Sequence, residues 1–204
     1  MRQQKDHKTI FAIATAALIS LALSAVSAVS CEAQTPQATP QVSARHKQAI
    51  ATFEQRVKEY VALREGLEDK LPKLAEDSKP EQIEAHKVSF QNTVRTARAG
   101  AKQGDLFVPE IAAYIRLTIA DEFKGRERQE LRKKVLVEAD TKAVALRVNY
   151  PYPESEELLD MPPTLLLRLP QLPKQVKYRL VGKNLLLVDR ENGLIVDYML
   201  NAVP

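Results

Sequence analysis

Several residue types that carry chemistry are scarce in this chain of 204 residues. It has no tryptophan, one cysteine and three histidines, and only 5% of its residues are aromatic. Tryptophan is the best stacking platform for sugars, so its absence argues against a carbohydrate-binding module. The lone cysteine, Cys31, cannot form an internal disulfide. A folded domain in this chain must therefore be held by its apolar core alone.

Recognisable catalytic and metal-binding motifs are also missing. There is no HExxH, CxxC, G-x-S-x-G, P-loop or G-x-G-x-x-G sequence. His46 and His86 are far apart and have no clustered carboxylates beside them, so they do not form a recognisable metal or proton-transfer site. We therefore assign no catalytic residue, no metal ligand and no cofactor. Asp189 and Glu191 have adequate roles in a turn.

The first 33 residues have the layout of an export signal. A short basic segment precedes an uncharged run from Thr9 to Ser30, and small residues follow. Ala33 suits the last position before a peptidase cut, with Ala28 as a second choice. We expect residues 1–33 to be removed and the protein to be periplasmic or secreted. The run is also long enough to span a bilayer if it stays uncut.

Cys31 supports a different interpretation of the same segment. The sequence AVSC at residues 28–31 is a loose form of the bacterial lipoprotein box, in which leucine is usual where this chain has Ala28. A lipid attached to Cys31 would anchor the protein to a membrane. The signal segment or this lipid is the only membrane contact that we expect.

The remaining chain has a modest charge and begins with a tether. Removing residues 1–33 takes away three basic and two acidic residues, which leaves a net charge of +3. So small an excess requires neither a nucleic acid nor a membrane as partner. Residues 34–44, QTPQATPQVSA, contain almost nothing to bury and are typical of a flexible tether. Residues 45–204 then have the size of one domain.

Helical periodicity fills the first half of this domain. Apolar residues recur at steps of three and four between Ile50 and Leu71, with Arg64 in the one skipped position. A second stripe follows Ser78, which we expect to form a capping box with Glu81. Two such helices joined by a short connection predict an antiparallel hairpin.

Two further helices are predicted before the pattern changes. Pro109 is a typical early-helix residue, and Ile111, Ile115, Ile119 and Phe123 line up behind it. Residues 126–140 predict a fourth, weaker helix. Its neighbourhood, residues 124–134, has six cations interrupted by Glu127 and Glu130 and no aromatic residue, which is typical of a solvated face. We therefore expect no nucleic-acid partner.

The second half of the domain predicts β-structure. Residues 143–149 have the alternation of a strand. The proline-rich stretch that follows is expected to be irregular, except for a short helix at 164–169. Residues 176–200 predict a three-stranded antiparallel meander. The fold class is therefore α+β: an N-terminal helical hairpin, one or two further helices, and a small β-meander packed on them.

Two tight turns set the register of the meander. Pairing Val181 with Asn184, and Asp189 with Leu194, gathers one apolar face. That face consists of Val176, Tyr178, Leu180, Leu185, Leu187, Leu194, Val196, Tyr198 and Leu200. On the opposite face, the same register places Arg179, Leu186 and Asp197 in one row. We interpret Asp197 as an ion-pair partner of Arg179, which makes its role structural.

Tyr150 and Tyr152 are the candidate contact residues for a protein partner. The sequence NYPYP at 149–153 holds both rings on a stiff, extended backbone, which lowers the entropic cost of binding. The alternative is that both rings cover the edge of the sheet. The candidate binding residues are thus Tyr150, Tyr152, Arg179 and Asp197. Arg95, Arg98 and Lys102 form a modest basic stripe on the second helix.

The chain resembles a family of small exported bacterial proteins of acidobacterial type. The resemblance rests on residues 53–74 (FEQRVKEYVALREGLEDKLPKL), 101–111 (AKQGDLFVPEI), 146–153 (LRVNYPYP) and 162–204. It implies export and a single domain in which helices precede β-structure. The family has no assigned activity, so the resemblance transfers no catalytic residue.

The function that these observations favour is binding. We expect an exported, non-enzymatic envelope or secreted protein that binds another macromolecule, with a protein as partner. The alternative is a hydrolase-like enzyme with its site in a cleft between the helices and the sheet. A cavity holding His86 with a buried carboxylate would favour the enzyme.

Overall fold

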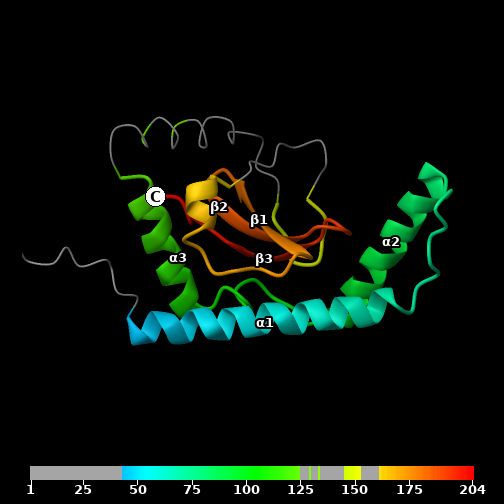
Figure 1. The fold of residues 1–204 in the computed structure, drawn as a ribbon, viewed down its shortest axis with the longest axis horizontal. Helices are drawn as coiled ribbons and strands as arrows, with labels where there is room; N and C mark the ends of the chain where they lie inside the picture. The colour runs from blue at the N-terminus through cyan, green and yellow to red at the C-terminus, as the bar shows by residue number, and fades with distance from the viewer. Residues whose placement is uncertain (1–42, 125–128, 130–132, 134–144, 153–160) are drawn as a thin grey trace, which may run out of the picture. The chain divides into compact units, whose positions relative to one another are not determined.

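The computed structural model describes residues 43–124, 129, 133, 145–152 and 161–204. Cys31, the export segment and the tether up to residue 42 lie outside the described residues. The elements run in the order α1 (Ala44–Glu68), α2 (Pro80–Ala97), α3 (Pro109–Glu122), α5 (Pro163–Leu166), β1 (Val176–Val181), β2 (Asn184–Asp189) and β3 (Ile195–Met199). Helices thus precede an antiparallel sheet (Figure 1), which confirms the α+β fold class. Within the described ranges, no helix is long and apolar enough to cross a membrane.

Helix α1 follows the predicted stripe. The Ser43 side chain caps its start by accepting a hydrogen bond from the His46 N–H at 3.2 Å. Phe53, Val57 and Tyr60 are buried along one face. Arg64 occupies the skipped position of the stripe and is also buried, so this charged side chain lies among the core residues.

Helix α2 begins one residue later than predicted from a Ser78 capping box. Pro80 is its first residue and Lys79 its N-cap, and the Gln82 side chain accepts a hydrogen bond from the Lys79 N–H at 2.8 Å. Gln82 therefore makes the capping hydrogen bond that was expected of Glu81. The helix starts one residue later because Pro80 occupies its first position.

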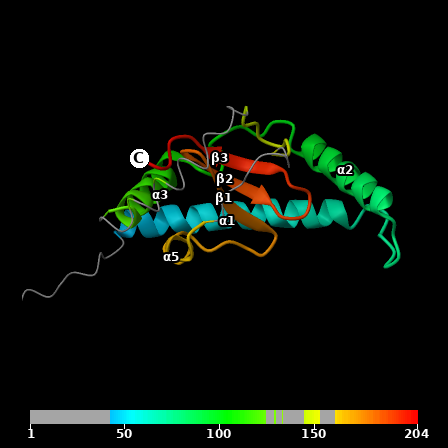
Figure 2. The same ribbon diagram turned by 90° about the horizontal axis from the view of Figure 1, so that it is seen from above.

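Only the second half of α2 packs on the core. Phe90 and Val94 are buried, whereas Ile83 is 48% exposed. Figures 1 and 2 show α2 leaning away from α1, so the two helices contact each other near one end. Helix α3 lies near the first turns of α1 in both views. Its predicted inward residues Ile111, Ile115, Ile119 and Phe123 are all buried, which confirms that stripe.

The other local predictions have mixed outcomes. The fourth helix at 126–140 lies outside the described residues, apart from 129 and 133, which are helical. The described part of the predicted strand, residues 145–149, is not a strand. Asn149 there has a φ of 64°, which interrupts an extended chain, and one isolated bridge joins Pro151 to Leu194. The short helix is α5, at the start of the predicted span 164–169.

The predicted register of β1 and β2 is confirmed. Val181 pairs with Asn184 across a two-residue turn, and Tyr178 pairs with Leu187. The start of the next turn is also as predicted, because the Asp189 N–H donates to the Leu194 carbonyl at 3.0 Å and Val188 pairs with Ile195.

The rest of β3 departs from the prediction because of a β-bulge. After the Val188–Ile195 pair the register shifts, so that Leu187 pairs with Asp197 and Leu186 with Tyr198. One extra residue in a strand moves every later side chain to the other face. The predicted face was therefore wrong for its last two members: Tyr198 packs on the opposite face and Leu200 is 43% exposed. Met199 takes their place in the core.

The sheet separates two apolar clusters. The larger cluster lies between the sheet and helices α1, α2 and α3, and includes Phe53, Phe90, Ile115, Leu185 and Leu187. The smaller one covers the other face and consists of Tyr152, Leu186, Val188 and Ile195, with Leu146, Val181 and Tyr198 packed against it. Both faces of the sheet are therefore covered by apolar side chains. The charged residues Asp189 and Asp197 of the sheet are buried among them.

Candidate functional site

The structure separates the two candidate tyrosines. Tyr152 is 4% exposed and packs in the smaller apolar cluster, so its ring covers a face of the sheet and not the edge that the alternative predicts. Tyr150 is 36% exposed and lies beside a concave surface of about 590 Å³. We call this surface the Tyr150 hollow. Its principal lining residues are Arg95, Lys102, Leu146, Arg147, Tyr150 and Tyr198.

Two arginines hold defined positions over the Tyr150 ring. The guanidinium carbons of Arg95 and Arg147 lie 4.5 Å and 4.0 Å from the ring centroid, within the range of cation–π attraction. Arg95 also donates to the Asn149 carbonyl at 3.2 Å and to Asn92 Oδ1 at 3.1 Å. Its guanidinium group is thus oriented before any ligand arrives.

The cations of the hollow have no acidic partner among the residues that the structure describes. Among the described residues that line it there is no aspartate or glutamate. Arg95, Lys102 and Arg147 make no ion pair with any residue in the part of the chain that the structure describes. The hollow therefore combines three cations with aromatic and aliphatic surface, which suits an anionic group carried by a partly apolar ligand.

Asn149 and Arg98 fix the backbone behind the hollow. Arg98 Nη1 donates to Asn149 Oδ1 at 2.5 Å, and Asn149 Nδ2 donates back to the Arg98 carbonyl at 2.7 Å. Arg98 Nη2 also reaches the Val196 carbonyl at 3.1 Å. Burial lowers the pKa of Arg98, and the nearby Tyr60, Asp197 and Asp105 oppose this effect. These bonds tie the Tyr150 segment to α2 and to β3.

Asp197 is structural, but its predicted ion pair with Arg179 is wrong. The bulge puts Asp197 opposite Leu187, and the row across the sheet is Arg179, Leu186 and Tyr198. Burial raises the pKa of Asp197, and four backbone N–H groups oppose that shift. These donors, at 2.7–2.9 Å, are Gly104, Leu106, Phe107 and Tyr198. Asp197 thus anchors the loop before α3 to the sheet.

Arg179 lies on β1, where it lines a different concave surface. That surface includes Val176, Lys177 and Tyr178 of the same strand. Of the four candidate binding residues, the structure therefore leaves Tyr150 at one surface and Arg179 at another. Tyr152 and Asp197 are buried, and their side chains contribute to neither surface.

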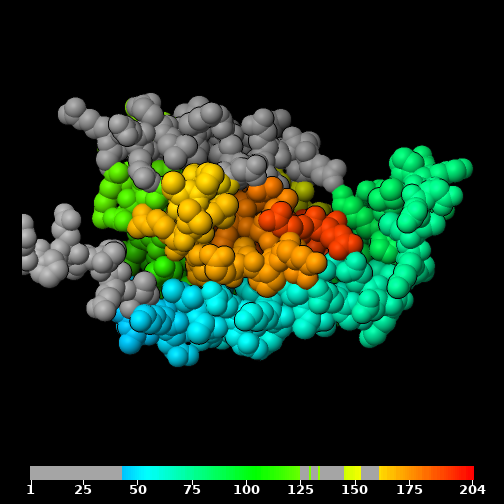
Figure 3. Space-filling view, viewed as in Figure 1, coloured from blue at the N-terminus to red at the C-terminus, as the bar shows by residue number. Residues whose placement is uncertain are grey.

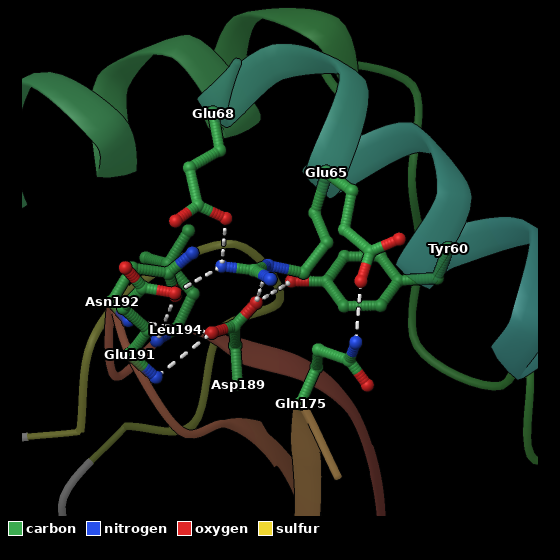
Figure 4. Close-up of polar contacts among 9 residues, drawn as sticks. Tyr60, Glu65, Glu68, Gln175, Asp189, Glu191, Asn192 and Leu194 are labelled. Atoms are coloured by element: carbon green, nitrogen blue, oxygen red, sulfur yellow. Dashed lines mark hydrogen bonds and ion pairs between the residues drawn. The ribbon is translucent and has the colours of Figure 1, made fainter. Parts of the chain in front are cut away.

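A buried polar cluster joins α1 to the β2–β3 turn. Figure 4 shows Tyr60, Glu68, Asp189 and Glu191 converging there. The Tyr60 hydroxyl donates to Asp189 Oδ2 at 2.7 Å, and Arg64 Nε lies 3.1 Å from the same oxygen. Asp189 Oδ1 accepts the N–H groups of Glu191 and Asn192 within the turn, at 3.0 Å and 3.3 Å.

Arg64 also joins two further carboxylates in this cluster. Its Nη2 lies 2.5 Å from Glu191 Oε2 and 2.9 Å from Glu68 Oε2. Burial lowers the pKa of Arg64, but Asp189 and the two glutamates outweigh burial, so its pKa is raised. Arg64 therefore stays charged and bridges helix and turn.

The geometry of this cluster favours a structural role over proton transfer. Burial, followed by the charge of Asp189, raises the pKa of Tyr60 far above its ordinary value. Tyr60 therefore remains a hydrogen-bond donor, and both oxygens of Asp189 already have partners. A general base needs a free lone pair within reach of a substrate proton.

The hydrolase alternative finds no support among the described residues. Glu122, a third buried carboxylate, accepts Thr164 Oγ1 at 2.6 Å and Arg168 Nη1 at 3.0 Å. His46 contacts the Tyr114 ring, and His86 lines neither the Tyr150 hollow nor the concave surface beside Arg179. Within the described ranges, no group of three His, Cys, Asp or Glu residues could hold a metal ion.

Comparison with protein-family profiles, with curated proteins and with solved structures found no match for this chain.

The sequence predicts Tyr150 as a contact residue and a basic stripe on the second helix, but no pattern in it places the two together. Residues 95 and 150 are far apart in the sequence, and the contact depends on the positive φ of Asn149. The sequence did contain one usable signal for the buried cluster: Arg64 stands in an apolar stripe, where a charged residue needs an acidic partner.

Proposed function

We propose that this is an exported, non-enzymatic protein that binds an acidic segment of another protein at the Tyr150 hollow. The observation that carries the proposal is the gathering of Arg95, Lys102 and Arg147 beside the partly exposed Tyr150. No described lining residue carries a negative charge. A partner that brings carboxylates to this surface would gain charge-assisted hydrogen bonds without displacing an ion pair between described residues.

The preorganisation of the hollow supports binding over a role in folding alone. Arg95 is already held by Asn149, Asn92 and the Tyr150 ring. Fixing an arginine beforehand lowers the entropic cost of association. Tyrosine and arginine are also among the residue types enriched at the energetic hot spots of protein interfaces.

The overall charge of the chain favours a protein partner over a nucleic acid. The net charge of the whole chain is only +4, so it generates little long-range attraction for a phosphate backbone. Three local cations match a short run of aspartate or glutamate. Export rests on the layout of residues 1–33, and the resemblance described above implies the same location.

The binding proposal can be tested by fluorescence anisotropy with a labelled hexaglutamate peptide. We expect Arg147→Gln to weaken binding by about fivefold to tenfold, equivalent to about 1–1.4 kcal/mol. Lys58→Gln is the matched control, because Lys58 is exposed on α1 and does not line the hollow. Equal affinity of wild type and Arg147→Gln would contradict the proposal.

A second arm of this experiment identifies the class of partner. A labelled single-stranded oligonucleotide replaces the peptide under the same salt conditions. Tighter binding of the oligonucleotide, with the same dependence on Arg147, would replace the protein partner by a nucleic acid. We expect the oligonucleotide to bind more weakly than the peptide and to lose affinity steeply with added salt.

Mass spectrometry of the protein isolated from cells expressing the full chain tests the export proposal. A mature chain that starts at Gln34 is expected, and an acylated Cys31 would establish the lipoprotein alternative. A chain that still begins at Met1 in the cytoplasmic fraction would overturn export.

A further inference from the structure

One flank of α2 carries a regular row of residues. The row consists of Glu81, Glu84, Val88, Asn92 and Arg95. Successive members are three or four positions apart, which places all of them on one face of the helix. Glu81, Glu84 and Val88 line one concave surface, and one turn further on Arg95 Nη1 donates to Asn92 Oδ1. We call these five residues the α2 row.

Most of the α2 row is accessible from outside. Val88 is 43% exposed, the Glu84 side chain is 64% exposed, and Glu81 and Asn92 are exposed as well. Figures 1 and 2 show the first half of α2 projecting beyond the sheet. Figure 3 shows the side chains of this half, in green at the right of the view, extending past the end of the sheet. A second molecule can therefore approach the row.

The α2 row is complementary to itself about Val88. Glu81 and Arg95 are equally distant from Val88 along the sequence, and so are Glu84 and Asn92. Along the helix axis the outer pair lies about 10 Å from Val88 and the inner pair about 6 Å. Consider two α2 helices that lie side by side in opposite directions, with Val88 facing Val88. Glu81 of one helix is then opposite Arg95 of the other, and Glu84 is opposite Asn92.

The basic end of the row has hydrogen-bond donors to offer. Arg95 uses Nε for the Asn149 carbonyl and Nη1 for Asn92, and its Nη2 makes no hydrogen bond with a described residue. Asn92 accepts through Oδ1, whereas its Nδ2 has no acceptor among the described residues. Carboxylates of a second copy can therefore accept from Arg95 Nη2 and from Asn92 Nδ2.

The acidic end of the row has carboxylates to match these donors. Glu84 has a long ion pair with Lys87, at 3.8 Å, and within the described ranges Glu81 makes no ion pair. Both side chains can thus turn toward a second copy without breaking a short contact.

The charges of the row select the antiparallel arrangement. In a parallel pair of α2 helices, Glu81 would face Glu81 and Arg95 would face Arg95, and like charges placed together oppose association. In the antiparallel pair, a two-fold axis passes between the two Val88 side chains. Each contact between Glu81 and Arg95 therefore forms twice.

We infer that two copies of this chain pair through the α2 row, so that Glu81 of each copy binds at the Tyr150 hollow of the other. The inference rests on the proposed binding of acidic segments at the hollow, and it names the source of one such segment. Arg95 connects the two surfaces, because it lines the hollow and also ends the row. The contact uses one helix of each copy and one apolar residue, so we expect a weak, reversible dimer.

Sedimentation equilibrium of the protein isolated from cells expressing the full chain tests the pairing, at concentrations up to about 1 mM. We expect a monomer–dimer equilibrium for the wild type. Glu81→Arg and Arg95→Glu should each weaken the dimer by about tenfold or more, because each variant places like charges together twice. The double variant Glu81→Arg/Arg95→Glu has both contacts with reversed charges, so its dissociation constant should return to within about threefold of wild type.

Glu76→Arg is the matched control for these variants, because it makes the same charge change at an exposed position before α2. It should leave the dimer unchanged. A wild-type chain that stays monomeric at all these concentrations, or a dimer that Glu81→Arg does not weaken, would overturn the inference.

Val88→Glu separates the pairing from the Tyr150 hollow. It brings two carboxylates together at the two-fold axis and should weaken the dimer by about tenfold or more. Val88 does not line the hollow, so hexaglutamate binding at low protein concentration should stay unchanged. Ser89→Glu adds the same charge at the next residue, which is exposed and lies outside the row, and should leave the dimer intact. Equal weakening by both variants would contradict the α2 row as the interface.

The outcomes distinguish this inference from the proposed function. Arg147-dependent binding of hexaglutamate by a chain that stays monomeric supports the proposed function and rejects the pairing. The opposite result is a dimer that is weakened in Glu81→Arg and restored in the double variant, without Arg147-dependent binding of hexaglutamate. That result supports the pairing and rejects the hollow as a general site for acidic segments.

Discussion

The Tyr60 hydroxyl donates a hydrogen bond of 2.7 Å to Asp189 Oδ2, although 129 positions separate the two residues in the chain. Tyr60 lies in the middle of α1 and Asp189 at the end of β2. This bond and the adjacent ion pair with Arg64 place the β2–β3 turn on α1. The sheet is thereby fixed against the helix that contributes most of the buried cluster.

Replacing Tyr60 by phenylalanine tests this bond directly. The change removes one donor to a buried carboxylate and keeps the ring in the core. We expect Tyr60→Phe to lower the free energy of unfolding by about 1.5–3 kcal/mol, as measured by urea denaturation. Tyr150→Phe is the matched control and should change stability by less than about 0.5 kcal/mol, because Tyr150 is partly exposed and its ring is retained.

Arg64 should contribute more than Tyr60 to the free energy of unfolding, because removing Arg64 leaves the buried Asp189 without an ion-pair partner. We expect Arg64→Met to lower the free energy of unfolding by about 3–5 kcal/mol. Arg45→Met, at an exposed position of the same helix, provides the matched control and should be nearly neutral. A loss equal to that of Arg45→Met would show that the buried cluster does not hold the turn on α1.

The raised pKa of Glu68 predicts how the free energy of unfolding depends on pH. Burial, then a hydrogen bond with Glu191, raises the pKa of Glu68 above its ordinary value of 4.5, although Arg64 acts in the opposite direction. A group with a raised pKa in the folded state stabilises fully below its unfolded pKa. That contribution is lost as the pH rises through the folded pKa.

Comparison with Glu68→Gln isolates this effect. The variant cannot ionise, so its stability relative to wild type should increase as the pH rises from about 4 to about 7. Denaturation curves at several pH values give the difference in unfolding free energy. A difference that falls with rising pH would mean that the charged form of Glu68 is the one favoured by the fold. Glu59→Gln, on an exposed part of α1, is the control.

The hydrogen bonds of Asp197 should hold the loop before α3 in place on the sheet. Asparagine at this position has only one acceptor oxygen, and its amino group would face N–H donors. We expect Asp197→Asn to lower the free energy of unfolding by about 2–4 kcal/mol and to speed hydrogen exchange at Gly104, Leu106 and Phe107. Asp77→Asn in an exposed loop should change neither quantity. Unchanged exchange at all three amides would contradict the anchoring role.

The features that could be predicted from the sequence are those set by local spacing. The α1 stripe and the β1–β2 register follow from residue periods and from a two-residue turn, and both are confirmed. The bulge in β3 could not be predicted, because nothing in the sequence IVDYM distinguishes a regular strand from a shifted one. Asp197 turns toward the loop amides, and only the packed structure shows them.

The Tyr150 hollow could not be predicted from the sequence for the same reason. The sequence identifies Tyr150 as a candidate from its position before a proline, and Arg95 as part of a basic stripe on the second helix. Their contact depends on the bonds that Asn149 makes with Arg98 and with β3. These are long-range interactions between segments whose sequences show no mutual pattern.

The measurement that tests the central claim most directly is an NMR titration of the ¹⁵N-labelled protein, isolated from cells expressing the full chain, with hexaglutamate. We expect the amides of Lys102, Arg147 and Tyr150 to shift together with one dissociation constant, while those of α1 do not shift. Shifts spread evenly over the exposed lysines and arginines of the chain, with none concentrated at the Tyr150 hollow, would contradict it.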